Sequence, residues 1–315
     1  MAEAEYTIPA SNAHVIEERI LQIGVDGELQ WIDFDQLSPI GDAKKPFPSP
    51  ITRSMIIDGH LFAFWVEHDI LAARMASINL SEEFVQGAHK SEVRAAMQPS
   101  PQRPPPVEVA GANWSRVLDA EPLGLCNLNG RIVFALWKRG IYCLGVNAEE
   151  FWRVGELNWP ELESIPRGQE ICGLHTTGDD LMIWSRGGGW AKLSGADGRT
   201  IERGSINVPS SITGTYFSPD AGWLLASNRG HLVRIKEVQD EPITIDVGGP
   251  ISAAVWDEEI SGWRICGWRE NLIWNENELK RWDLDELCVQ LIKHPSGWKV
   301  LENTGQWRNF SDSTR

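Results

Sequence analysis

A short turn recurs along the chain and decides the fold: Trp137-Lys-Arg139-Gly140, Trp184-Ser-Arg186-Gly187 and Ser227-Asn-Arg229-Gly230. The steps between the three arginines are 47 and 43 residues, and Trp268-Arg269-Glu270-Asn271 is a degenerate fourth copy. An apolar run precedes each turn and a mixed, strand-like run follows it, while glycine supplies the positive φ that tight hairpins need. The repeated turn therefore predicts a β-hairpin that recurs about every forty residues.

Repeats of this length are typical of β-propellers, in which each repeat forms a four-stranded blade. We predict an all-β, seven-bladed propeller of antiparallel blades, whose incomplete last blade is closed by an N-terminal strand around Tyr6–Pro9. Six blades is the alternative, because either Arg269–Asn271 or Asn275–Asn277 can be the C-terminal hairpin. Glu28–Leu37 and Glu278–Leu287 share five of ten positions, so both are interpreted as a third strand and its exit. The first strands of successive blades are placed at Ala13–Glu17, Ile51–Ile57, Pro122–Leu128, Ile171–Thr176, Ile212–Ser218, Ile251–Asp257 and Trp298–Glu302.

The whole chain, residues 1–315, is interpreted as one propeller domain with an insertion at residues 81–120 between blades two and three. Within the insertion, residues 98–108 form a proline-rich loop that we expect to be extended and dispensable for folding. A second, smaller insertion at residues 149–169 is expected to pack on the outside of blade three. Its Trp159, like Trp114, is a candidate exposed anchor.

One segment has the pattern of a known repeat family. Ile212-Thr-Gly-Thr-Tyr-Phe-Ser-Pro-Asp-Ala-Gly222 looks like the first strand and turn of a WD repeat, and Trp282-Asp283 falls where that family has its namesake dipeptide. On these residues the chain resembles the WD40 and quinoprotein-like β-propellers. The resemblance implies the fold and a tendency to scaffold complexes, and it transfers no functional residue.

Charge and composition exclude several classes of partner. Lysine and arginine number 29 against 44 aspartates and glutamates, which gives a formal net charge of −15. A general nucleic-acid binder or a protein that docks on anionic lipid would carry a basic face, so neither partner is expected. No secretory signal or long apolar run is present, and a cytoplasmic location is expected. The five cysteines, Cys126, Cys143, Cys172, Cys266 and Cys288, are interpreted as buried reduced thiols.

The sequence lacks the common motifs of catalytic and cofactor sites. It has no nucleophile elbow, no phosphate-binding loop and no zinc-protease motif, and its seven histidines show no metal-ligand spacing. We therefore expect no cofactor and no metal. The favoured function is a non-catalytic scaffold that binds proteins within a larger assembly. The alternative is an enzyme or sensor that acts on a small anionic ligand at the central channel. It is less favoured because the predicted first strands are small or apolar, with His175 as the main exception.

The repeated arginines are the candidate binding residues. Arg139, Arg186 and Arg229, with Arg269 of the degenerate copy, lie in turns between second and third strands, so all should emerge on one side of their blades. The corresponding turns of the other blades carry acidic residues, namely Asp26, Glu67, Asp69 and Glu302. We predict a basic arc that binds an acidic segment of a partner protein. The alternative is that each arginine lies over a neighbouring tryptophan or pairs with a local carboxylate.

Overall fold

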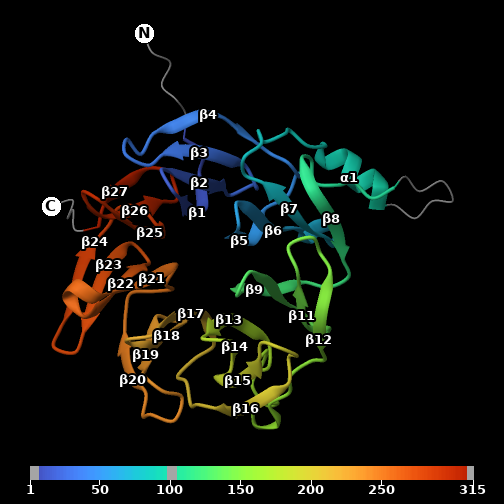
Figure 1. Cartoon of the computed structure of the whole chain (residues 1–315). Coiled ribbons are helices and arrows are strands. Elements are labelled where there is room, and N and C mark those ends of the chain that lie inside the picture. Colours follow the sequence, from blue (N-terminus) through green and yellow to red (C-terminus); the bar gives the residue numbers. More distant parts are fainter. Residues whose placement is uncertain (1–6, 98–104, 311–315) are drawn as a thin grey trace. The chain divides into compact units, whose positions relative to one another are not determined.

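A computed structural model describes residues 7–97 and 105–310 of the chain (Figure 1). The described residues form seven antiparallel sheets, each built from strands that are consecutive in the chain. The protein is an all-β, seven-bladed propeller, which confirms the predicted fold class. The chain divides into two compact units, residues 1–156 with blades one to three and residues 157–315 with blades four to seven.

Each blade of the first unit has four strands. Blade one contains β1 (Ala10–Ile16), β2 (Arg19–Gly24), β3 (Leu29–Asp33) and β4 (Pro39–Lys44). Blade two contains β5 (Ile51–Ile57), β6 (His60–Glu67), β7 (Ala72–Asn79) and β8 (Ala112–Leu118). Blade three contains β9 (Pro122–Leu128), β10 (Arg131–Leu136), β11 (Gly140–Leu144) and β12 (Glu150–Val154). The helical elements of this unit are η1 (His68–Ile70) and α1 (Lys90–Met97).

The second unit repeats this plan. Blade four contains β13 (Ile171–Thr177), β14 (Asp180–Ser185), β15 (Gly189–Ser194) and β16 (Thr200–Ser205). Blade five contains β17 (Ile212–Ser218), β18 (Gly222–Ser227), β19 (His231–Ile235) and β20 (Ile243–Asp246). Blade six contains β21 (Ala253–Asp257), β22 (Gly262–Gly267), β23 (Glu270–Asn275) and β24 (Leu279–Asp283). Blade seven has three described strands, β25 (Cys288–His294), β26 (Gly297–Glu302) and β27 (Trp307–Asn309), and the short helical turns are η2 (Pro160–Leu162) and η3 (Glu258–Ile260).

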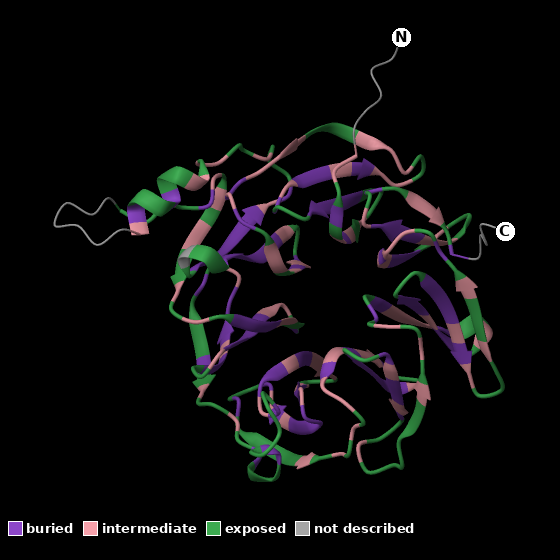
Figure 2. Ribbon diagram, turned by 180° about the vertical axis from the view of Figure 1, so that it is seen from behind, coloured by how far each residue is buried: buried purple, intermediate pink, exposed green. Residues whose placement is uncertain are grey.

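Burial follows strand rank within a blade. Second strands such as β6 and β18 are buried along nearly their whole length, because neighbouring blades cover both of their faces. Fourth strands such as β16 and β20 are mostly exposed (Figure 2). The continuous apolar runs in the sequence therefore mark the second strands, whereas the polar, variable runs mark the outer edge.

A β-bulge recurs at the second residue of the first strand. The register against the second strand shifts there in six of the seven blades. The bulge leaves a carbonyl of the second strand without its ladder partner, and small polar side chains bind there. Ser11 Oγ donates to the carbonyls of Ile23 and Gly24, and Thr213 Oγ1 donates to that of Ala226. The bulge gives the first strands of these six blades the same register, so residues at equal positions in them can be compared.

Three details differ from the predicted strand plan. Trp298–Glu302 was expected to be the first strand of blade seven, but β25 is first and β26 is second. Leu279–Asp283 is a fourth strand, whereas Leu29–Asp33 is a third strand as predicted. Tyr6 of the expected N-terminal strand lies outside the described residues. Thr7–Pro9 form no strand, and the Pro9 carbonyl accepts from the Val25 amide of blade one.

Both insertions contain residues that pack against blades. In the first, Phe84 stacks on Trp31 with ring centroids 5.5 Å apart, while Val93 and Val109 are buried in the core of blades one and two. In the second, Trp159 is only 1% exposed, and its indole nitrogen donates to the Trp190 carbonyl of blade four at 3.1 Å. The expectation that Trp159 is an exposed anchor was therefore wrong. The expectation that the second insertion packs outside blade three holds for Glu150–Val154, which form the outer strand β12, but not for Trp159, which packs on blade four.

Two of the five cysteines are not reduced thiols. Cys266 on β22 and Cys288 on β25 form a disulfide with their Cα atoms 5.6 Å apart, and this bond joins blades six and seven. Within the described residues, Cys126, Cys143 and Cys172 form no disulfide, and burial raises the pKa of the Cys143 thiol to about 11. The sequence could not reveal the pair, because the two cysteines meet only through the packing of consecutive blades.

Candidate interaction surface

The four predicted arginines all lie in turns between the second and third strands of their blades. Arg139 follows β10, Arg186 follows β14, Arg229 follows β18 and Arg269 follows β22. The Arg269 turn joins β22 to β23, whereas Asn275–Asn277 joins β23 to β24, so both hairpins exist and seven blades result. Gly140 adopts φ +101°, and a Cβ there would lie 2.1 Å from the Val154 carbonyl oxygen, so glycine is required after Arg139.

Two of the arginines form ion pairs with carboxylates of the same chain. Arg139 Nε lies 3.1 Å from Asp119, and both side chains are more than half exposed. Arg186 Nε lies 2.6 Å from Glu170, whose side chain is only 1% exposed. Arg167 binds the same carboxylate through Nε at 2.6 Å and Nη2 at 2.8 Å. Because Glu170 is buried, Arg186 is part of the support of blade four, and the alternative of local pairing describes it well.

Arg229 and Arg269 differ from the other two. Both residues are exposed, and within residues 7–97 and 105–310 neither forms an ion pair. The Arg229 amide donates to Ser227 Oγ at 3.3 Å, which fixes the turn but leaves the side chain outside. Arg269 has φ +57°, and its carbonyl accepts from the Leu284 amide at 2.8 Å. The two guanidinium groups on blades five and six are therefore available to a partner.

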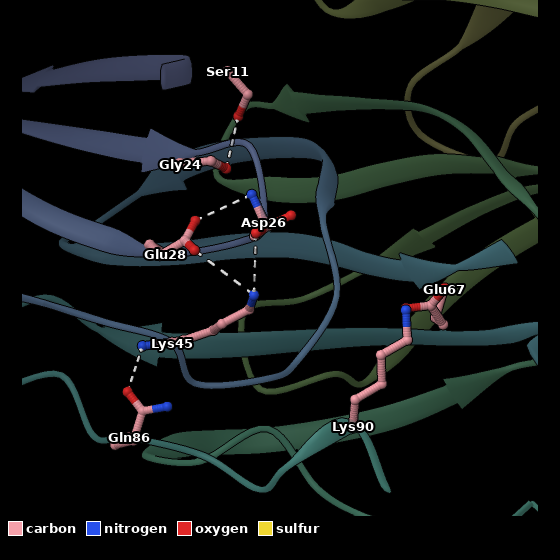
Figure 3. A network of polar contacts seen from close by, with 8 residues as sticks. All are labelled: Ser11, Gly24, Asp26, Glu28, Lys45, Glu67, Gln86 and Lys90. Atoms are coloured by element: carbon pink, nitrogen blue, oxygen red, sulfur yellow. Dashed lines mark hydrogen bonds and ion pairs between the residues drawn. The ribbon is translucent and has the colours of Figure 1, made fainter. Parts of the chain in front are cut away.

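The acidic turns of blades one and two are neutralised by lysines from outside the strands (Figure 3). Lys45 Nζ lies 3.8 Å from Asp26 and 3.7 Å from Glu28. Lys90, at the start of α1, places Nζ 2.6 Å from Glu67 and 3.8 Å from Asp69. In blade seven, Glu302 pairs with Arg308 at 2.9 Å, and burial raises its pKa. Most carboxylates of these turns are thus already paired with a cation of the same chain.

Large apolar side chains are exposed in several of the same turns. Leu71, in the turn of blade two, is 87% exposed and adopts the left-handed conformation with φ +50°. Val25 in the turn of blade one is also exposed, and Trp268, directly before Arg269, is 52% exposed. A tryptophan beside an arginine is the composition most enriched at protein–protein hot spots. We call Arg229, Trp268 and Arg269 the turn surface.

First strands bring together one further group of polar residues. His14 Nε2 lies 2.7 Å from Ser54 Oγ, and His175 Nε2 lies 2.7 Å from Thr215 Oγ1. Each histidine is the fifth residue of its first strand, and each hydroxyl is on the fourth residue of the next. At the same positions Met55 and Leu125 pack in one apolar cluster. The replacement of a polar pair by an apolar pair in the same fold position indicates a packing role.

Burial keeps these two histidines neutral. It lowers the pKa of both His14 and His175 from 6.5 to about 4, and a hydrogen bond with Thr215 opposes the shift at His175. The edge of the His175 ring also meets the Trp223 ring at 5.1 Å between centroids. His175 had stood out as the polar exception among the first strands, and the structure shows what it contacts.

Residues 7–97 and 105–310 contain no group of three or more histidine, cysteine, aspartate or glutamate side chains placed to hold a metal ion. Among the described helices, none is long and apolar enough to cross a bilayer.

The structure is similar to solved WD40 propellers. The WD40 domain of Doa1 matches with a TM-score of 0.65 and 11% identity, covering 99% of this chain and 97% of that one. The Cps50 (Swd1) propeller of Myceliophteria thermophila matches at 0.65 with 10% identity and 97% coverage of both chains. The C-terminal WD40 domain of Sif2 matches at 0.62 with 12% identity, covering 95% of this chain and 80% of that one. At such identities the similarity shows the fold alone.

No family model matches the sequence, and no curated protein matches it either.

Proposed function

We propose that the protein is a non-catalytic propeller scaffold that binds an acidic segment of a partner protein on the turn surface. The observation that carries the proposal is the exposed Trp268 beside two arginines, Arg229 and Arg269, that have no ion pair in the described chain. Arginine and tryptophan are the anchors that interfaces use most. On a chain of net charge −15, local positive charge also orients an acidic partner toward one place.

Arg139 and Arg186 enter the proposal differently. Arg139 is exposed and held by an exposed Asp119, so it can exchange this partner for another carboxylate at low cost. Arg186 pairs with the buried Glu170 and thereby stabilises blade four. Its guanidinium is not available to bind a partner. The binding arginines of the proposal are therefore Arg229 and Arg269, with Arg139 as a separate, weaker contribution in the first unit.

The test compares partner binding by two charge-reversal variants. Arg229→Glu with Arg269→Glu removes the positive charge of the turn surface. Arg199→Glu with Lys280→Glu makes the same change in net charge at exposed positions away from it. Both proteins and the wild type are used to purify partners from native cell extract across a salt series. We expect one stoichiometric partner to be lost from the first variant and kept by the second.

A variant of the turn surface that keeps its partner with an unchanged salt slope would overturn the proposal. Reversal of Arg186 is unsuitable for this test, because it would place a second negative charge beside buried Glu170 and unsettle the blade. Trp268→Ala separates the apolar contribution from the charge, and its effect should not depend on salt.

The proposal includes a cytoplasmic location, and the disulfide provides its test. Glutathione and thioredoxin keep most cytosolic thiols reduced, whereas Cys266 and Cys288 are bonded in the structure. Both cysteines are buried in the folded protein, so intact cells are quenched with acid and the protein is alkylated under denaturing conditions. Mass spectrometry then distinguishes the two states. Both cysteines should be alkylated if the protein is cytoplasmic, and a bond that resists alkylation would favour an oxidising compartment.

A further inference from the structure

A cleft of about 520 Å³ opens between blades five and six, at the opposite end of the strands from the turn surface. Its walls come from the turns between first and second strands and the connections between third and fourth strands. In blade five these are residues 220, 221, 234–236, 240, 241 and 243, and in blade six they are residues 256, 260, 261 and 275–277. All of these residues belong to the second unit.

The apolar part of the cleft consists of five side chains, those of Ala221, Ile235, Ile243, Trp256 and Ile260. Ile235 is buried, whereas Trp256 and Ile260 are half-buried at the edge of the space. The Trp256 ring packs edge-on against buried Trp263, with centroids 5.7 Å apart, so its position is fixed before a ligand arrives. Ile243 on β20 is 52% exposed and lines the same space. A partner that covers Ile243 would therefore bury apolar area that water now contacts.

The polar part of the cleft is mainly acidic. Four exposed carboxylates line it, namely Asp220, Asp240, Glu241 and Glu276, against two cations, Arg234 and Lys236. Within residues 7–97 and 105–310, none of these six side chains forms an ion pair. The Arg234 guanidinium lies 4.9 Å from the centre of the Trp274 ring, which holds it against the wall of the cleft. The carboxylates exceed the cations by two, so the lining attracts positive charge.

We propose that this cleft binds an extended, lysine- or arginine-rich segment of a second protein partner, with one aliphatic side chain of that segment on Ile243 and Trp256. The volume suits a few residues of peptide. Carboxylates on both blades bracket the aliphatic contact, which places basic residues on either side of it. The turn surface favours acidic segments, so the two ends of the same blades select partners of opposite charge.

Three fluorescein-labelled peptides test this proposal by fluorescence polarisation with the full chain. The first is Gly-Lys-Lys-Leu-Lys-Lys-Gly, the second replaces leucine by serine, and the third replaces every lysine by glutamate. We expect saturable binding of the first peptide, about tenfold weaker binding of the second, and none of the third. Raising the salt from 0.05 to 0.3 M should weaken the first peptide strongly, because the exposed charges are screened.

Two matched variants locate the binding site. Glu241→Lys with Glu276→Lys should weaken the first peptide by tenfold or more. Glu161→Lys with Glu202→Lys changes the net charge equally at exposed positions outside the cleft and should leave binding within about twofold. Ile243→Ser should abolish the preference for leucine over serine.

Equal weakening by both charge variants would show general attraction to an acidic protein and would overturn the proposal. Absence of saturable binding to wild type at millimolar protein would overturn it as well. The turn-surface variant Arg229→Glu with Arg269→Glu should bind the first peptide at least as well as wild type, so failure of either proposal is seen separately.

Discussion

The turns of blades one and two and the turns of blades five and six occupy the same fold position but differ in what covers their charges. In blades one and two, Lys45 and Lys90 come from connecting segments and bind the turn carboxylates. In blades five and six, no segment of the described chain binds Arg229 or Arg269 in this way. The difference teaches that a charged turn is open to other molecules only where the rest of the chain leaves it uncovered.

The largest expected effect on stability is in blade four, where the arginine of the turn pairs with a buried carboxylate. Arg167→Ala with Arg186→Ala leaves the carboxylate of Glu170, 1% exposed, without either cation. Removing the partners of a buried charge costs about 3–5 kcal/mol. We expect this loss in the free energy of unfolding measured by urea denaturation.

A third substitution tests the cause of that loss. Adding Glu170→Leu removes the buried charge itself, so the triple variant should recover most of the lost stability. A double variant whose free energy of unfolding lies within about 1 kcal/mol of wild type would contradict this prediction. The arginine turn of blade four would then matter as little for stability as those of blades five and six.

Acid should destabilise both units through the histidine–hydroxyl pairs. Folding lowers the pKa of His14 and His175 from 6.5 to about 4, so the folded protein binds fewer protons than the unfolded chain between these values. Stability is therefore complete above pH 6.5 and falls as the pH drops toward 4, by about 3 kcal/mol for each histidine. Urea denaturation at intervals between pH 7 and pH 4 measures this slope.

The control for this prediction is a variant that replaces the histidine–hydroxyl pair of blades one and two by the apolar pair found at the equivalent position of blades two and three. His14→Met with Ser54→Leu reproduces the apolar pair Met55–Leu125 at the equivalent position. This variant should lose about half of the acid sensitivity, because the pair around His175 remains. An unchanged pH slope would show that groups other than His14 cause the loss.

The parts of the fold that depend on neighbouring residues could be predicted from the sequence. Ile51–Ile57, Pro122–Leu128 and Ile212–Ser218 are first strands with the predicted bounds, because apolar runs and glycine turns mark hairpins locally. The first strand of blade seven was misplaced because two similar runs, Cys288–His294 and Gly297–Glu302, follow each other there.

The pairing of the charged turns was harder to predict, since it depends on residues distant in the sequence. All four arginines lie in the predicted turns, but nothing near Arg186 in the sequence shows that Glu170 is buried beneath it. Likewise, Lys90 lies in an insertion whose contact with Glu67 depends on how α1 packs. The cleft between blades five and six was not foreseen, because its lining comes from five separated segments.

A direct test of covered and uncovered turns compares two single substitutions. Lys90→Ala removes the closest partner of Glu67, whose side chain is only 9% exposed, and should cost about 1–2 kcal/mol. Arg229→Ala removes an exposed side chain without an ion pair in the described chain and should change stability by less than about 0.5 kcal/mol. Hydrogen exchange should report loosening of residues 90–97 in the first variant alone. Equal costs would remove the distinction between the two pairs of blades.

The smallest effect is expected in the proline-rich loop, residues 98–108, of which residues 98–104 lie outside the described chain. Replacing residues 98–104 by a Gly-Ser linker of equal length should change stability by less than about 0.5 kcal/mol, because a proline-rich stretch neither completes a ladder nor buries much apolar area. Extending the replacement through Val107 should cost more. Val107 packs on the core of blades one and two, and its carbonyl accepts from Arg74 Nε at 3.1 Å. Urea denaturation of the two replacements therefore locates where the chain returns to the core of blades one and two after α1. A loss of several kcal/mol from the shorter replacement would place that return before residue 105.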